Sequence, residues 1–242
     1  MSHSAPTRVL RRGIELMAVE PPQGFRTSGD EPRGTRLVLI RHGEAECNVA
    51  GIVGGPLGCT GLTELGREQA RALGDRLRRT REFDDAVATY SSVLRRAKET
   101  AVLVTAGVIS SECVEDCDLC ELHPGLADAM DWDQMVSAFG GPDWDVDPTQ
   151  PFAPEGESWT GFYERCVGAF LRLAERHPEG LVLLFVHGGV IEQAMKLALG
   201  TPASARLRLR TEHCSLTEIE IDHGVVRLLR YNDRAPREVT AR

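Results

Sequence analysis

The sequence has 242 residues, 42% of them hydrophobic, and carries a formal net charge of −8 at pH 7. This length fits one α/β domain with a full core, and the negative charge argues against nucleic acid as a partner. No apolar stretch approaches the ~20 residues of a membrane span, so no membrane partner is expected. The apolar stretch at residues 14–19 is shorter than the core of a signal peptide.

Residues 1–34 differ in character from the rest of the chain. They are rich in proline and glycine and show little hydrophobic periodicity, so we predict a mobile N-terminal extension followed by a single domain over 35–242. The seven cysteines are odd in number and scattered along the chain. That usage is typical of reduced thiols, which predicts a cytoplasmic location.

The first predicted element is a strand over residues 37–40. Its four apolar residues show no polar alternation, which is typical of a strand buried on both faces of a parallel sheet. The strand ends in Arg41, His42 and Gly43, at the position where open α/β sheets bind ligands. A guanidinium, an imidazole and a glycine together suit the binding of an anion beside a nitrogen nucleophile.

Further strands and helices alternate along the chain. In order they are a helix over about 63–79, a strand over 86–90, a helix over about 94–106, a less regular segment over about 110–156, a helix over about 158–177, a strand over 181–186, a helix from 190, and two antiparallel closing strands. This alternation predicts an α/β fold, a three-layer α/β/α sandwich around a mostly parallel central sheet with an antiparallel edge.

The strand over 181–186 ends in the same way as the first one. His187 and Gly188 follow it directly, and a helix begins shortly after them. Glycine allows backbone N–H groups to approach an oxyanion, and a helix N-terminus adds a favourable dipole. Two histidines at equivalent strand ends, with arginines at 95 and 96 opening another helix, therefore predict one anion-binding site.

Several segments in this order resemble the histidine phosphatase superfamily, in its phosphoglycerate mutase-like branch 1. The resemblance spans roughly Arg36 to Asp233 and implies the phosphoglycerate mutase-like fold, with one catalytic domain over 35–242. The motifs that carry it are Arg41-His42-Gly43-Glu44 with Asn48 six residues after His42, Leu62-Thr63-Glu64-Leu65-Gly66, Ser91-Ser92-Val93-Leu94-Arg95-Arg96-Ala97, Asp118-Leu119-Cys120-Glu121, Phe185-Val186-His187-Gly188-Gly189, Cys214-Ser215-Leu216-Thr217 and Tyr231-Asn232-Asp233.

The resemblance implies a metal-independent phosphatase that hydrolyses a small phosphate monoester through a phosphohistidine. The residues implied are His42 as the nucleophile, His187 as a second, cationic imidazole, Arg41 and Arg96 as clamps on the phosphoryl oxygens, Glu121 as the general acid, and Asn48 and Gly188 as further phosphate-binding residues. No cofactor and no metal ligand are implied, because guanidinium and imidazole groups supply the positive charge.

Acidic residues are concentrated in one part of the chain. Residues 99–164 contain fifteen Asp or Glu and no Lys or Arg, and all three tryptophans lie there. Such a run is usually a solvated face. In this family, however, the segment after the acid motif usually overhangs the pocket. If residues 122–157 do so here, the overhang would be both acidic and aromatic, with Trp132 or Trp144 and several carboxylates near the leaving group. It would then disfavour substrates with several anionic groups and suit an apolar, neutral or cationic leaving group.

Three alternative functions remain open. Mutase-type phosphoryl transfer is less favoured, because the basic residues expected after the acid motif are absent. A catalytically silent phosphate-binding module on the same fold is the second alternative. The third is a metal site formed from the spacing of Cys113, Cys117, Cys120 and His123, although structural zinc sites usually have a second ligand pair. The sequence also leaves the oligomeric state open, with a homodimer as one alternative.

Two residues depart from the family pattern near the site. Glu192 stands where many phosphatase members carry a basic residue, and His213 occupies a position often filled by asparagine. Neither belongs to the catalytic set that the resemblance implies, but both bear on the identity of the substrate.

Overall fold

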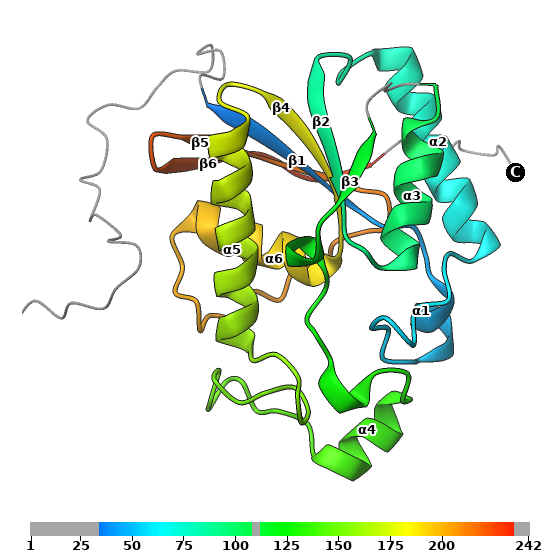
Figure 1. Cartoon of the computed structure of the whole chain (residues 1–242), viewed down its shortest axis with the longest axis vertical. Helices are drawn as coiled ribbons and strands as arrows, with labels where there is room; N and C mark the ends of the chain where they lie inside the picture. Colours follow the sequence, from blue (N-terminus) through cyan, green and yellow to red (C-terminus); the bar gives the residue numbers. More distant parts are fainter. Residues whose placement is uncertain (1–33, 108–111, 235–242) are drawn as a thin grey trace, which may run out of the picture. The chain divides into compact units, whose positions relative to one another are not determined.

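The computed structural model describes residues 34–107 and 112–234, which contain a six-stranded sheet with helices on both sides (Figure 1). The extension predicted over residues 1–34 lies outside the described residues, apart from Gly34. The strands are β1 (Thr35–Arg41), β2 (Ala86–Ser91), β3 (Cys113–Glu115), β4 (Leu181–Val186), β5 (Leu216–Asp222) and β6 (Val225–Asp233). The helices are α1 (Glu46–Ala50), α2 (Glu64–Thr80), α3 (Arg95–Thr105), α4 (Trp132–Phe139), α5 (Trp159–Arg176) and α6 (Gly188–Leu199), with 3-10 turns η1 (Cys117–Leu119) and η2 (Gly125–Ala127).

The strand order is β3-β2-β4-β1-β5-β6. The first four strands run parallel, and β5 pairs antiparallel with both β1 and β6. The predicted mostly parallel sheet with an antiparallel edge is therefore confirmed. The central position of β4 explains its composition, because all six of its residues are buried and no polar alternation is possible.

Helices cover each face of the sheet because successive side chains of a strand point to opposite faces. Val38 and Ile40 of β1 pack in a core cluster with residues of α2 and α3. Leu37 and Leu39 pack in a second cluster with residues of α5 and α6. Figure 1 shows these two helix pairs on opposite sides of the sheet, so the predicted three-layer sandwich is present.

Three short elements were not predicted. The helices α1 and α4 are five and eight residues long, and β3 has three residues at the edge of the sheet. Elements of this length offer too few periodic positions for a sequence pattern to distinguish them from a loop. The segment predicted as less regular over about 110–156 therefore contains β3, both 3-10 turns and α4.

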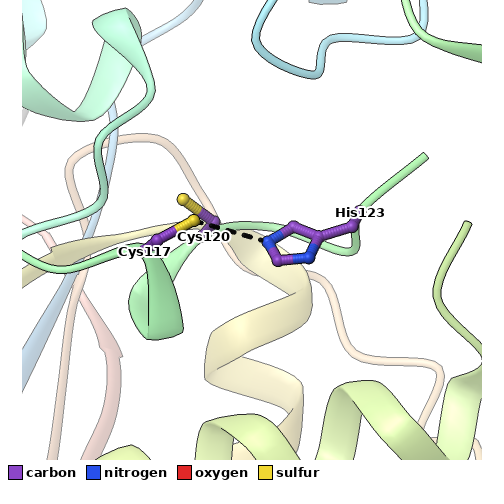
Figure 2. A group of neighbouring side chains, drawn as sticks. All are labelled: Cys117, Cys120 and His123. Carbon is purple, nitrogen blue, oxygen red and sulfur yellow. Dashed lines mark hydrogen bonds between the residues drawn. The ribbon is translucent and has the colours of Figure 1, made fainter. Parts of the chain in front are cut away.

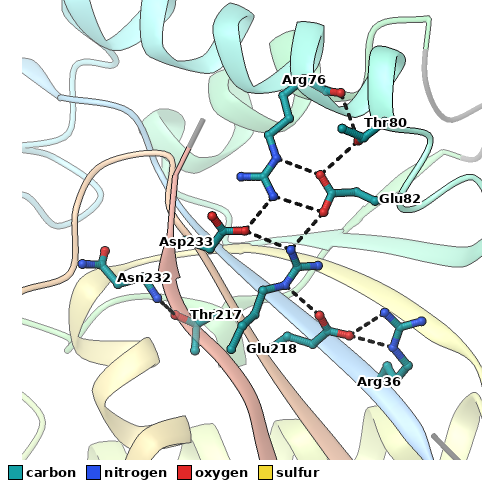
Figure 3. Close-up of polar contacts among 9 residues, drawn as sticks. Arg36, Arg76, Thr80, Glu82, Thr217, Glu218, Asn232 and Asp233 are labelled. Atoms are coloured by element: carbon teal, nitrogen blue, oxygen red, sulfur yellow. Dashed lines mark hydrogen bonds and ion pairs between the residues drawn. The ribbon is translucent and has the colours of Figure 1, made fainter. Parts of the chain in front are cut away.

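An ionic network joins the antiparallel edge of the sheet to the end of α2 (Figure 3). Glu218 is buried in β5 and accepts hydrogen bonds from Arg36 at 2.6 Å and from Arg230 at 2.8 Å. Arg230 also contacts Glu82 at 2.9 Å, and Arg76 of α2 donates to Glu82 at 2.8 Å. Each charge in this partly buried cluster therefore has a partner, as burial requires.

Two segments lie beyond the carboxyl ends of the parallel strands, one around α1 and one around α4 (Figure 1). Backbone hydrogen bonds join them, from the Val53 N–H to the Met130 carbonyl at 2.8 Å and from the Ala129 N–H to the Val53 carbonyl at 3.0 Å. Among the described residues, no helix combines the length and apolar composition that crossing a membrane requires.

Candidate active site

The parallel register of β1 and β4 brings the two predicted histidines together. Arg41 lies opposite Val186, and the His42 N–H donates to the Val186 carbonyl at 3.0 Å. The residues that follow each strand, His42 and His187, are consequently neighbours, with ring centroids 5.1 Å apart. Both side chains are buried. Strand pairing alone therefore places two imidazoles at one end of the sheet.

Arg96 connects these two rings. It lies in the first turn of α3, is 4% exposed, and donates its Nε–H to His42 Nε2 at 3.1 Å and to His187 Nδ1 at 3.2 Å. Its Nη1 donates to the Gly54 carbonyl at 2.7 Å, which holds the guanidinium in place. The sequence predicted that Arg96 and the two histidines share one site, and in the structure they are in contact.

The hydrogen bonds indicate that the His42 imidazole is neutral. His42 Nδ1 lies 2.6 Å from the Gly43 carbonyl, so Nδ1 carries the ring proton. Nε2 is then unprotonated and has a lone pair. Burial, followed by the Arg96 charge, holds the pKa of His42 well below its usual range. A neutral imidazole with an available Nε2 is the form that can attack phosphorus.

His187 is held neutral in the free protein. Burial, followed by the charges of Arg96 and any proton on His42, lowers the pKa of His187 well below 6.5. The ring is therefore neutral when no anion is present, and the cation expected beside bound phosphate stays a prediction. The neutral state results from tertiary packing, since the burial of the ring and the adjacent Arg96 guanidinium both disfavour a second positive charge.

Three buried nitrogens near the site have no hydrogen-bond partner among the described residues. One is Nε2 of His213, and the other two are the donors Nε of Arg41 and Nε2 of His187. Arg41 is held at its other end, where Nη1 donates to the Thr211 carbonyl. Buried polar groups in folded proteins are rarely left unpaired, and an oxyanion would satisfy both donors.

Glu121 reaches the same site from the loop after η1. Its Oε2 accepts the backbone N–H of Gly189 at 3.0 Å, at the start of α6. A Cβ at Gly189 would lie 2.2 Å from Glu121 Oε1, so only glycine permits this approach. Gly188 stays a predicted phosphate-binding residue, and a Cβ there would lie 3.6 Å from Arg41 Nε. Gly189 was missed, although it belongs to the same Gly-Gly pair.

A cavity of about 440 Å³ opens above these groups, and its wall includes Arg41, His42, Arg96 and Glu121. Asn48 also lines it, as an exposed side chain whose Oδ1 accepts the Ala45 N–H at 3.3 Å. Two of the predicted binding residues, His187 and Gly188, are not among the described residues that line the cavity. His187 is fully buried and in contact with His42 and Arg96.

The outer wall of the cavity is aromatic. It is formed by Trp132 and Trp144 from the α4 region, together with Phe152, Trp159 and Phe162. Trp144 stacks on Trp159 with ring centroids 5.2 Å apart. None of the acidic side chains at 122–157 lines the cavity. The overhang is therefore present, but it contributes aromatic rings rather than carboxylates.

Two charged residues on this wall were not predicted as site residues. Arg206 lies 5.7 Å from the ring centroids of both Trp144 and Trp159, a cation–π geometry. Glu192 accepts the Leu207 N–H at 2.7 Å, and burial raises its pKa. The sequence marked Glu192 as a departure from the family pattern, but nothing in the sequence connected either residue to the tryptophans.

The arrangement can bind a tetrahedral oxyanion between two guanidiniums and a buried imidazole N–H. It presents a neutral nitrogen nucleophile to the bound group and a carboxyl group on the same cavity wall. His213 lies nearby, with its ring centroid 5.7 Å from that of His42. Burial, followed by the Arg41 charge, lowers the pKa of His213 to about 4, so it too is neutral near pH 7.

Comparison with known proteins gives consistent results. The family model of the histidine phosphatase superfamily (branch 1) matches residues 37–234. A metal-independent phosphoserine phosphatase of Arabidopsis thaliana is 32% identical, over 77% of this chain and 79% of the relative. Phosphoglycerate mutase-like protein 4 of the same plant is 31% identical, over 67% and 70%. The structure of a mycobacterial glucosyl-3-phosphoglycerate phosphatase with VO3 has a TM-score of 0.68 and 29% identity, covering 82% of this chain and 98% of that one.

Proposed function

Because the chain belongs to branch 1 of the histidine phosphatase superfamily and is a phosphatase, we propose that it hydrolyses phosphate monoesters through a phosphohistidine on His42. One observation carries the assignment of the nucleophile. The Arg96 Nε–H donates to both His42 Nε2 and His187 Nδ1, and Arg96 and His42 both line the cavity. Arg96, which would bind the phosphoryl oxygens, is thus already in contact with the nucleophile His42 and with the second imidazole, His187.

In the first step, the lone pair of His42 Nε2 attacks phosphorus and the bond from phosphorus to the ester oxygen breaks. Arg41 and Arg96 bind the phosphoryl oxygens, because a guanidinium matches that geometry with two parallel hydrogen bonds. His187 donates from Nε2 to a third oxygen and becomes easier to protonate as the anion arrives. These cations supply the charge compensation, so hydrolysis needs no added metal ion.

Glu121 completes the proton balance. It gives its proton to the departing ester oxygen, and the resulting carboxylate then takes a proton from the water that attacks the phosphohistidine. The bond from phosphorus to His42 Nε2 breaks in that step, which releases inorganic phosphate and restores the imidazole. Its place on the cavity wall and its hydrogen bond from the Gly189 N–H support this role, since the amide fixes the carboxyl group in position. Asn48 at the cavity rim and Gly188 beside Arg41 are further candidates for phosphate contact.

The substrate class follows from the outer wall. Four indole or phenyl rings, from Trp132, Trp144, Phe152 and Trp159, face the space that the leaving group would occupy. We infer that the substrate is a monoester with an aromatic or largely apolar leaving group. Such a substrate favours hydrolysis as the reaction, because a mutase moves phosphate between two positions of an anionic substrate. Phosphatases among the relatives, such as the phosphoserine phosphatase, support hydrolysis as the reaction.

Two coarser proposals accompany this one. We propose that residues 35–242 form one catalytic domain, supported by the single sheet that includes β1 near its start and β6 near its end. We also propose a cytoplasmic location, supported by the odd and scattered set of seven cysteines.

The test is a His42→Ala variant assayed with p-nitrophenyl phosphate in the presence of EDTA. We expect kcat to fall by roughly 10³-fold or more, because no other group supplies the covalent intermediate. Mass spectrometry of the parent enzyme quenched during turnover should show one phosphate on His42. His223→Ala is the matched control, since that histidine lies in the β5–β6 turn with a fully exposed side chain. Undiminished turnover by His42→Ala would overturn the assignment.

A further inference from the structure

A group of three metal-ligating side chains lies on the loop that leads to Glu121, which we call the Cys-Cys-His cluster (Cys117, Cys120 and His123). Their ligand atoms all lie within 4.8 Å of one another. Figure 2 shows the Cys117 thiol directed toward the imidazole of His123, with the sulfur of Cys120 beside that of Cys117. Among the described residues this is the only such trio of His, Cys, Asp or Glu side chains. The function proposed above uses none of the three.

The distances suit a tetrahedral metal. Cys117 Sγ lies 3.7 Å from His123 Nε2, and Cys120 Sγ lies within 4.8 Å of the ligand atoms of both other residues. A Zn²⁺ ion with bonds of about 2.3 Å to sulfur and 2.0–2.1 Å to nitrogen holds two such ligands about 3.6 Å apart. The Cys117 and His123 ligand atoms therefore already have the spacing that a bound Zn²⁺ ion would impose, and Cys120 Sγ lies within 4.8 Å of both.

The backbone holds the cluster in this arrangement. The Cys120 N–H donates to the Cys117 carbonyl at 3.0 Å, which closes η1 and brings the two thiols together. Arg165 of α5 donates to the carbonyls of Asp118 and Cys120 at 2.9 and 3.1 Å. Glu157 pairs with Arg165 at 2.7 Å and holds its guanidinium in turn. Metal binding would need little rearrangement of this loop.

We propose that the Cys-Cys-His cluster is a binding site for a thiophilic divalent metal ion, of which Zn²⁺ is the type, separate from the phosphate cavity. Two thiolates and one imidazole are the donor set that Zn²⁺ takes in proteins. Cys117 is exposed, so a water molecule can supply the fourth ligand. The predicted fourth candidate, Cys113, lies in β3 and is not part of the cluster.

The site adjoins the phosphatase centre without entering it. Glu121 lies between Cys120 and His123 in the chain, whereas none of the three ligands lines the cavity. A metal ion would cross-link the loop on both sides of Glu121 and so restrict its motion. The expected consequence is a more stable protein that still hydrolyses its substrate when the metal has been removed.

The experiment uses the full-length untagged protein, stripped of metal by a chelator and then titrated with Zn²⁺. We expect one Zn²⁺ per chain, and a rise in the melting temperature on binding, because the ion binds the folded state preferentially. Titration with Co²⁺ should give thiolate-to-metal charge-transfer absorption and the intense visible bands of tetrahedral coordination. The stripped parent should keep its phosphatase activity.

Cys117→Ser and His123→Ala should each weaken Zn²⁺ affinity by more than about a hundredfold, because each removes a ligand. Cys117 is exposed and His123 half-buried, so both changes are compatible with folding. Cys113→Ser is the matched control, a half-buried thiol four residues from Cys117 that should leave the affinity unchanged. Absence of stoichiometric binding, or equal affinity in Cys117→Ser and the parent, would overturn the proposal. Either result would leave the assignment of His42 untouched.

Discussion

At the scale of single residues, Arg96 has the central position in the site. Its Nε–H bonds both imidazoles, and its charge contributes with burial to lowering the pKa of His42 and of His187. The free site therefore holds neutral rings ready to accept charge. Arrival of a phosphoryl group would give the guanidinium a better acceptor than an imidazole nitrogen, because charge-assisted hydrogen bonds to phosphate are stronger.

Glu121 allows a test that distinguishes an acid from a binding residue. We expect Glu121→Gln to reduce kcat/KM by roughly 10²–10⁴-fold for an alkyl phosphate, whose leaving oxygen needs a proton. An activated aryl phosphate should lose far less, because its leaving group departs without protonation. The amide preserves an oxygen acceptor for the Gly189 N–H, so the position of the side chain is retained. Equal losses for both substrates, measured by steady-state kinetics, would assign Glu121 to binding or structure.

At the scale of elements, the strands determine which residues meet. The neighbouring strands β1 and β4 end in register, so His42 and His187 become adjacent although 145 positions separate them. The next strand, β2, contributes Arg96 through α3, because the Ser92 N–H bonds the Phe185 carbonyl at 3.0 Å. The ionic network around Glu218 lies at the antiparallel edge of the sheet, where Glu218 pairs with Val38 in the middle of β1. The network therefore shares no residue with the site.

The buried carboxylate of that network should matter for stability and not for turnover. Glu218→Gln removes the charge that two arginines share, and we expect the free energy of unfolding to fall by about 2–3 kcal/mol. Asp84→Asn breaks an exposed pair with Arg81 and should cost less than about 1 kcal/mol. Urea denaturation measures both effects. A large loss of kcat/KM in Glu218→Gln under native conditions would show that the network acts on the site.

At the scale of the whole molecule, the acidic residues that are concentrated in one part of the sequence do not line the cavity. The acidic side chains of residues 122–157 lie outside it, whereas the tryptophans of the same segment line it. Arginines 41, 96 and 206 and two glutamates, Glu121 and Glu192, are the charged groups on its wall. Selectivity should therefore depend on aromatic contact with the leaving group more than on repulsion by the acidic surface.

This distinction can be measured with two variants. We expect Trp144→Ala to lower kcat/KM for an aryl phosphate by roughly tenfold, since ring-to-ring contact is lost. Asp131→Asn combined with Asp133→Asn should change it less than about twofold, because neither carboxylate lines the cavity and Asn retains the helix cap. 3-Phosphoglycerate serves as the comparison substrate for each protein. A preference for it in the parent, or its conversion to 2-phosphoglycerate, would favour the mutase alternative.

The sequence by itself determined the sheet, the order of its main elements and the family. Unbroken apolar runs have few physical solutions other than buried strands, and the His-Gly ends mark where ligands bind. It did not determine the tautomer of His42, the neutral state of His187 or the role of Gly189. Those depend on burial and on atoms supplied by distant segments, such as the Gly43 carbonyl and the Arg96 guanidinium.

The aromatic wall and the Cys-Cys-His cluster also show that a sequence pattern does not determine which side chains come together. The pattern around Trp132 and Trp144 did not predict α4, because short helices have weak periodicity. It placed tryptophans and carboxylates alike near the leaving group, and only packing decided that the tryptophans line the cavity and the carboxylates do not. The cysteine spacing marked a candidate metal site, but spacing alone could not exclude Cys113 or show that three ligand atoms converge. Local pattern specifies which elements form and which residue types they carry. Only tertiary packing decides which side chains share a site, because distances between segments remote in sequence are set by the core between them.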